Sequence, residues 1–136
     1  MSRVYVVDDD LRHAKLAAKI VERTGNEATV FGDPIEALHA ACECKPDLLI
    51  VDMMMPEIDG LGLLRVLRKK GINTTAVIVS AYSTEVDKKL LPSNGVAAVV
   101  SKPYPIKLLM DVVTKALGDS GAAVGAAETV EEGGTT

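Results

Sequence analysis

Four short apolar stretches of this chain each run into polar residues that could take part in chemistry. Asp8, Asp9 and Asp10 follow Val4–Val7, Asp52 follows Leu48–Val51, Ser80 follows Ala76–Val79, and Ser101 and Lys102 follow Ala97–Val100. Short apolar runs bounded by polar or turn residues are typical of strands buried on both faces of a parallel sheet. Because ligands gather beyond the carboxyl ends of such strands, we expect these carboxylates, the hydroxyl and the ammonium to form one site.

The aspartates that follow the first two stretches predict a metal site. Asp8, Asp9, Asp10 and Asp52 would bring several negative charges together, which costs stability unless a cation lies between them. Mg²⁺ suits this place because it binds through few carboxylates and keeps waters that a phosphoryl group can replace. Alternatively, Asp8 to Asp10 only cap the next helix and complement its dipole. The presence of Asp52 and Lys102 favours the metal site.

Asp52, Ser80 and Lys102 could together carry out phosphoryl chemistry. A carboxylate such as Asp52 can act as a nucleophile and form an aspartyl phosphate. Lys102 offers a point charge for a phosphate, and the Ser80 hydroxyl can donate a hydrogen bond to a phosphoryl oxygen. Alternatively, Lys102 is a solvated lysine beside a turn, and the Ser80 hydroxyl only makes a hydrogen bond to a backbone group. Neutralising the phosphoryl oxygens is most of what phosphoryl transfer asks of a protein.

Alternating strand and helix patterns must position these residues. The expected strands are residues 3–8, 27–31, 47–52, 76–80 and 97–101, and the expected helices are residues 11–23, 34–43, 61–69 and 106–117. A further helix over Glu85–Leu91 should be short or kinked, because Pro92 lacks an amide proton. Repeated strand–helix units have right-handed crossovers, so we expect an α/β fold: a five-stranded parallel sheet with helices on both faces.

The composition indicates one globular domain followed by a short tail. Apolar residues make up 48% and charged residues 25%, and residues 1–118 carry the periodic patterns. Residues 119–136 are mostly Gly, Ala, Glu and Thr, which predicts a disordered tail or a linker stub. Cys42 and Cys44 lie two apart in a helical stretch, so their side chains diverge and we expect no disulfide between them.

Charge and hydropathy restrict the environment and the partners. The formal net charge of −4 argues against nucleic acid as a partner of this domain. No apolar run approaches the roughly 18 residues of a membrane span, and the N-terminus lacks a signal-peptide pattern. We therefore expect a cytoplasmic protein without membrane contact. His13 and His39 are expected on helix surfaces, and no pattern places either of them near the site.

Four motifs, taken together and in this order, resemble the receiver domains of two-component response regulators. They are Val6-Val7-Asp8-Asp9, Ile50-Val51-Asp52 with Met55-Pro56 and Asp59-Gly60, Val79-Ser80-Ala81, and Ser101-Lys102-Pro103. The resemblance covers about residues 3–118. It implies a flavodoxin-like, doubly wound sheet with strand order 2-1-3-4-5. Receivers often have a cis peptide bond at this place, so the resemblance also implies a cis bond between Lys102 and Pro103.

The resemblance assigns a role to each motif residue. Asp52 would be the phosphoacceptor, and Asp8, Asp9, Asp52 and the backbone carbonyl of Met54 would hold Mg²⁺. Ser80 would be the switch hydroxyl and Lys102 the lysine that pairs with the phosphoryl group. The donor would be a sensor histidine kinase or a phosphotransfer protein, and the output a downstream protein effector or a missing output domain. Such a domain catalyses only its own phosphorylation and dephosphorylation and is otherwise not an enzyme.

Two residues depart from the receiver pattern. Receivers usually have an aromatic switch residue where this chain has Val99, so either the output surface moves differently or Tyr104 or Tyr82 takes the role. Pro92 falls in the fourth helix, which often forms part of the signalling face.

Three other functions share parts of this pattern. A haloacid-dehalogenase-type phosphatase would need a second aspartate where Met54 stands. A flavodoxin-like electron carrier would need a Ser/Thr-rich phosphate loop and aromatic side chains to stack on flavin, whereas the loop here is acidic and aromatic residues make up 3% of the chain. A receiver-like scaffold that is not phosphorylated stays open because of Val99.

Overall fold

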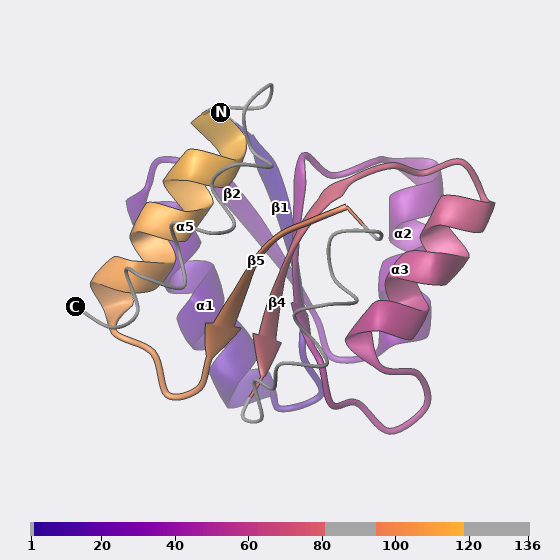
Figure 1. Ribbon diagram of the computed structural model, residues 1–136, viewed down its shortest axis with the longest axis horizontal. Coiled ribbons are helices and arrows are strands. Elements are labelled where there is room, and N and C mark those ends of the chain that lie inside the picture. The colour runs from indigo at the N-terminus through magenta and orange to yellow at the C-terminus, as the bar shows by residue number, and fades with distance from the viewer. Residues whose placement is uncertain (1, 81–94, 119–136) are drawn as a thin grey trace.

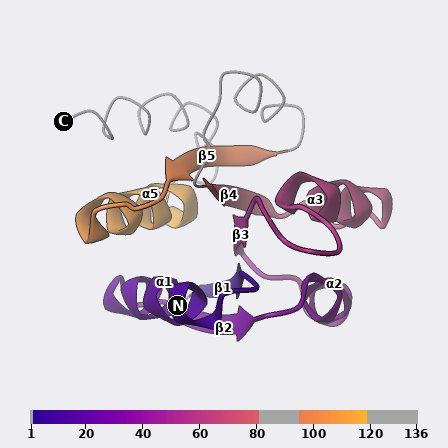
Figure 2. The same cartoon turned by 90° about the horizontal axis from the view of Figure 1, so that it is seen from below.

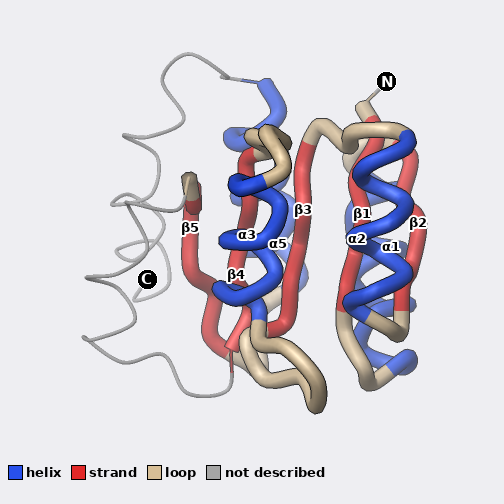
Figure 3. Tube along the Cα trace, turned by 90° about the vertical axis from the view of Figure 1, so that its right-hand side faces the viewer, coloured by secondary structure: helices blue, strands red, loops and turns tan. Residues whose placement is uncertain are grey.

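The protein folds around a single sheet of five parallel strands. The computed structural model describes residues 2–80 and 95–118, so the expected helix over Glu85–Leu91, Pro92, Tyr82 and the expected tail lie outside the described residues. The strands are β1 (Arg3–Val7), β2 (Glu27–Phe31), β3 (Leu48–Asp52), β4 (Thr75–Ser80) and β5 (Val96–Ser101). Their order is β2-β1-β3-β4-β5, which confirms the doubly wound, flavodoxin-like sheet (Figure 3).

Helices cover both faces of the sheet, as the alternating pattern predicted. They are α1 (Leu11–Arg23), α2 (Pro34–Glu43), α3 (Gly60–Lys69) and α5 (Ile106–Gly118). α1 and α5 lie on one face, and α2 and α3 lie on the other (Figures 1 and 2). Every described element begins and ends within one residue of its predicted bounds.

Aspartate caps begin three of the helices immediately beyond a strand end. The side chain of Asp10 accepts a hydrogen bond from the amide of Arg12 at the start of α1, and that of Asp33 accepts from Ile35 at the start of α2. Asp59 accepts from the amide of Gly62 at the start of α3. Each cap satisfies an amide that has no partner within its helix. The short connections bring the first turns of these helices to the carboxyl edge of the sheet.

Side-chain alternation along the strands divides the core into two clusters. Val6 and Ile50 belong to the cluster under α1 and α5, whereas Val7 and Val51 belong to the cluster under α2 and α3. All residues of β3 are buried, as expected for the central strand. The same alternation directs the residues that follow Val7 and Val51 toward the α1 and α5 side. The core therefore sets the direction of Asp8 and Asp52.

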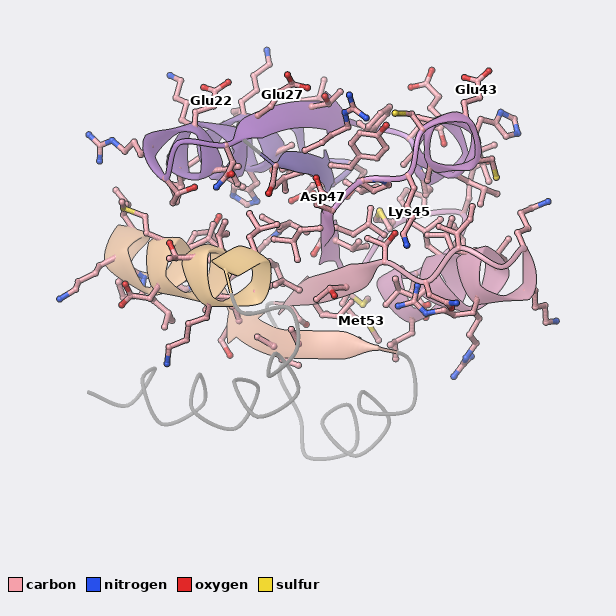
Figure 4. The ribbon with its side chains drawn as sticks, turned by 90° about the horizontal axis from the view of Figure 1, so that it is seen from above. Glu22, Glu27, Glu43, Lys45, Asp47 and Met53 are labelled. Atoms are coloured by element: carbon pink, nitrogen blue, oxygen red, sulfur yellow. The ribbon has the colours of Figure 1, made fainter. Side chains whose placement is uncertain are left out.

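Charged residues at the edge of the sheet where the strands begin, opposite the edge with Asp8 and Asp52, face outward. Figure 4 looks onto that edge and shows Glu22, Glu27 and Glu43 pointing away from the core.

Cys42 and Cys44, at the end of α2, are free and exposed thiols. Among residues 2–80 and 95–118, no helix is long and apolar enough to cross a membrane.

Gly60 closes the loop between β3 and α3 by a tight backbone approach. Its amide donates to the carbonyl of Met53 at 3.1 Å. A Cβ at this position would lie 3.0 Å from the Asp52 carbonyl oxygen and 3.1 Å from Val51 Cγ1. A side chain here would therefore push the helix away from the strand that carries Asp52.

We predict that Gly60→Ala lowers the free energy of unfolding by about 1–3 kcal/mol, the usual cost of overpacking. Gly32→Ala is the matched control, because its Cβ would meet only the end of the exposed Leu11 side chain, which can rotate away. Urea unfolding of both variants measures the difference. Equal stability of the two variants would contradict the close approach at Gly60.

Candidate functional site

Backbone hydrogen bonds fix the residues that follow the strands. The amide of Asp8 donates to Phe31 of β2 at 3.1 Å, and the amide of Lys102 donates to Ser80 of β4 at 2.8 Å. The amide of Met53, directly after Asp52, donates to Val79 at 2.8 Å. These bonds extend the strand pairing by one residue, so the side chains at the carboxyl edge are held on rigid backbone.

The structure brings together the three aspartates that the resemblance assigned to Mg²⁺. Carboxylate oxygens of Asp8, Asp9 and Asp52 all lie within 4.8 Å of one another. Asp8 and Asp52 are buried, whereas Asp9 is exposed. Asp10 instead caps α1, so the capping alternative holds for that residue.

Lys102 supplies the cation that this cluster needs. Its Nζ lies 3.1 Å from Asp8 Oδ2 and 3.4 Å from Asp52 Oδ1. Only 18% of the lysine side chain is exposed, so it is not the solvated lysine of the alternative interpretation. The ammonium therefore lies between the two buried carboxylates.

Burial and charge shift the pKa values of this pair. Burial raises the pKa of Asp52, the charge of Asp8 raises it further, and Lys102 opposes both. Burial alone would lower the pKa of Lys102, but the hydrogen bond to Asp8 and the charges of Asp8 and Asp52 raise it above its ordinary value. Lys102 thus stays an ammonium, whereas Asp52 carries its negative charge at a cost.

The residues present fit a divalent cation. Hard cations such as Mg²⁺ take oxygen ligands and few carboxylates, and this cluster offers oxygens from two buried aspartates and an exposed one. Asp8 Oδ1 accepts the amide of Asp10 at 2.9 Å, which fixes the orientation of that carboxylate. Asp8, Asp9 and Asp52 could hold such an ion, which would offset their repulsion. The carbonyl of Met54 as a further ligand stays a prediction.

Ser80 and Val99 belong to the paired strands β4 and β5. Ser80 ends β4 and is buried, and Val99 packs against the cluster under α2 and α3. Tyr104 packs against the cluster under α1 and α5 and lines a small cavity with Asp8, Asp52 and Lys102. Tyr104 therefore does not fill the place of the missing aromatic at Val99. Lys102–Pro103 is cis, as the resemblance implied.

His13 is the site residue that the sequence analysis missed. It is exposed on the surface of α1, as expected, but no sequence pattern placed it near the site, and its Nδ1 lies 3.4 Å from Lys102 Nζ and 3.6 Å from Asp10 Oδ2. The reason is that α1 begins directly after Asp10, so its first turn passes beside the half-buried Lys102. His13 follows the helix cap Asp10 by three residues, and this spacing was the sequence signal that could have placed its side chain beside the aspartates. His39 is exposed on α2, as expected.

Comparison with known proteins identifies the family. The response regulator receiver domain family matches residues 4–114, and the chain belongs to this family. The fold described above is thus that of a receiver domain.

Individual relatives support the assignment. The DNA-binding response regulator MtrA of Mycolicibacterium paratuberculosis is 33% identical over 108 residues, which cover 79% of this chain and 48% of MtrA. The chain thus spans about half the length of that relative. The polar-differentiation response regulator DivK of Brucella anthropi is 28% identical over 119 residues, covering 86% of this chain and 97% of DivK. The solved receiver domain of Francisella response regulator 1452 has a TM-score of 0.81 at 32% identity, covering 88% and 99% of the two chains.

The raised pKa of Asp52 predicts how stability depends on pH. The folded state holds the Asp52 proton more tightly than the unfolded chain does. Protonation of Asp52 therefore contributes fully to stability below pH 3.8, the ordinary pKa. That contribution is lost as the pH rises through the raised pKa of the folded state. In magnesium-free buffer, Asp52→Asn should be more stable than wild type at neutral pH by about 0.5–2 kcal/mol. The gain should shrink as the pH falls toward 3.8.

Urea unfolding at several pH values measures this difference. The control is Asp111→Asn, which alters an exposed carboxylate on α5 and should show no such gain. A variant at Asp52 that is less stable than wild type at neutral pH would contradict the account.

Proposed function

We propose that this receiver domain is a phosphorylation-activated switch that accepts a phosphoryl group on Asp52 with Mg²⁺. The observation that carries the proposal is the buried Asp52 carboxylate, which lies beside both the Asp8 and Asp9 carboxylates and the ammonium of Lys102. A buried carboxylate beside a cation and a candidate metal cluster has what a phosphoacceptor requires.

The transfer would proceed by attack of a carboxylate oxygen of Asp52 on phosphorus. The P–N bond of a phosphohistidine donor breaks, its electron pair stays on the imidazole nitrogen, and an acyl phosphate forms on Asp52. Bound Mg²⁺ supplies charge neutralisation at the phosphoryl oxygens. Lys102 turns one N–H from Asp52 to a phosphoryl oxygen, and the Ser80 hydroxyl donates to another.

The hydrogen bonds that Lys102 and Ser80 would donate to the phosphoryl group are strong enough to shift a two-state equilibrium. Hydrogen bonds to charged groups contribute about 1.5–3 kcal/mol each. Reversing a 1:99 equilibrium takes about 5.5 kcal/mol of differential interaction. Two such bonds, made only by the phosphorylated form, therefore come close to that requirement.

The proposed partners follow from the same chemistry. A sensor histidine kinase or a phosphotransfer protein would donate the phosphoryl group, in the cytoplasm. The phosphorylated domain would signal by protein–protein contact with a downstream effector or an output domain, without binding nucleic acid or membrane itself. The domain is proposed as residues 1–118, followed by a tail or linker over residues 119–136. Because the match covers about half of MtrA, the proposal assigns none of the activity of that longer protein to this chain.

Intact-mass analysis after incubation with acetyl phosphate tests the proposal. We predict a gain of one phosphoryl group that requires Mg²⁺ and is lost in Asp52→Asn. With this donor a P–O bond breaks and acetate leaves. Asp111→Asn, on the exposed face of α5, should be phosphorylated as wild type is.

Failure to gain mass in folded, magnesium-loaded protein would contradict the proposal. It would favour the receiver-like scaffold instead. A gain of mass in Asp52→Asn equal to that of wild type would assign the phosphoryl group to another residue.

A further inference from the structure

A closed chain of polar contacts links the ends of β1 and β5 to the first turn of α1. Asp8 Oδ1 accepts the amide of Asp10 at 2.9 Å, and Asp10 Oδ2 lies 3.6 Å from His13 Nδ1. The same His13 nitrogen lies 3.4 Å from Lys102 Nζ, and Lys102 Nζ contacts Asp8 Oδ2 at 3.1 Å. Asp10 caps α1, but neither the fold nor the proposed function gives His13 a role.

The contact between Lys102 and His13 has one possible direction. An ammonium donates three hydrogen bonds and accepts none. A hydrogen bond between these two side chains therefore has Lys102 as the donor and His13 Nδ1 as the acceptor. Acceptors on Asp8, Asp52 and His13 lie 3.1, 3.4 and 3.4 Å from the lysine nitrogen, so there is one acceptor for each donor.

We propose that His13 is a positioning residue for Lys102 during phosphoryl transfer to Asp52, an inference that rests on the proposed function. When the phosphoryl group bonds to Asp52, one lysine donor turns to a phosphoryl oxygen. The other two donors stay on Asp8 and His13. Two anchors restrict the flexible lysine stem more than one anchor does, which keeps the ammonium in the orientation that the transfer needs.

A neutral anchor suits this position. Asp8 belongs to the acidic cluster, so its carboxylate is shared between the lysine and that cluster. A further carboxylate beside Lys102 would add negative charge where the phosphoryl group arrives. An imidazole that accepts at Nδ1 orients the ammonium without adding negative charge. Its place on α1 also ties β5 to a helix that is capped by Asp10.

Four variants separate the acceptor from the rest of the side chain. His13→Ala removes the acceptor, His13→Asn keeps a polar atom near the place of Nδ1, and His13→Gln places one near Nε2 instead. His39→Ala is the control, because His39 is exposed on α2. Thermal unfolding verifies that all four variants are folded.

The first measurement is the rate of mass gain over a range of acetyl phosphate concentrations at saturating Mg²⁺. This small donor has no docking surface, so its rate reports on the site alone. We expect His13→Ala to lower the maximal rate by about threefold to tenfold, the effect of losing one hydrogen bond. The concentration of Mg²⁺ at half-maximal rate should not change. His13→Asn should restore the rate, His13→Gln should not, and His39→Ala should match wild type.

The second measurement is the ¹⁵N signal of Lys102 Nζ in the unphosphorylated protein. We expect the signal to move in His13→Ala and to return toward its wild-type position in His13→Asn. It reports on the lysine whether or not phosphorylation occurs.

The outcomes separate this inference from the proposed function. Wild-type rates in His13→Ala, or equal rates in His13→Ala and His13→Asn, would overturn the positioning role and leave the proposed function standing. If wild type gains no phosphoryl group, the proposed function fails and the transfer role of His13 fails with it. An unmoved Lys102 signal in His13→Ala would show in either case that His13 does not hold the lysine.

Discussion

Repulsion among carboxylates at one edge of the sheet is the constraint on which the rest of this structure depends. Oxygens of Asp8, Asp9 and Asp52 lie within 4.8 Å of one another, and two of these side chains are buried, where water screens charge poorly. The ammonium of Lys102 lies between the buried pair. Among residues 2–80 and 95–118, Lys102 is the cation paired with both buried carboxylates, and its single charge does not balance three carboxylates. A divalent ion would supply the missing positive charge.

The order of the strands explains why the compensating group is a lysine. β1 and β3 are neighbours, so Asp8 and Asp52 meet directly, whereas β4 separates β3 from β5 (Figure 3). Two strand spacings amount to about 10 Å, and only a long side chain can carry a charge across such a distance. The mostly buried stem of Lys102 extends over the end of β4 to reach both carboxylates. Hydrogen bonds beyond the strand ends keep the two sides of this arrangement in register.

The sequence predicted what depends on strand ends and missed what depends on the direction of a helix. Apolar runs and caps gave the element bounds, and the parallel sheet then required Asp8, Asp52 and Lys102 to meet at one edge. His13 escaped because its contact depends on how far the Lys102 stem reaches and on which side of α1 faces it. The face on which Tyr104 packs likewise follows from the path of the chain after β5, which no local pattern encodes.

The most direct test of this electrostatic account is the stability of Lys102→Gln with and without Mg²⁺. Without Mg²⁺, the variant should lose about 1–3 kcal/mol of unfolding free energy, because two buried carboxylates lose their cation. Added Mg²⁺ should restore more stability to this variant than to wild type or to Lys115→Gln, which alters an exposed lysine on α5. A Lys102→Gln variant as stable as wild type, with no response to Mg²⁺, would contradict the account.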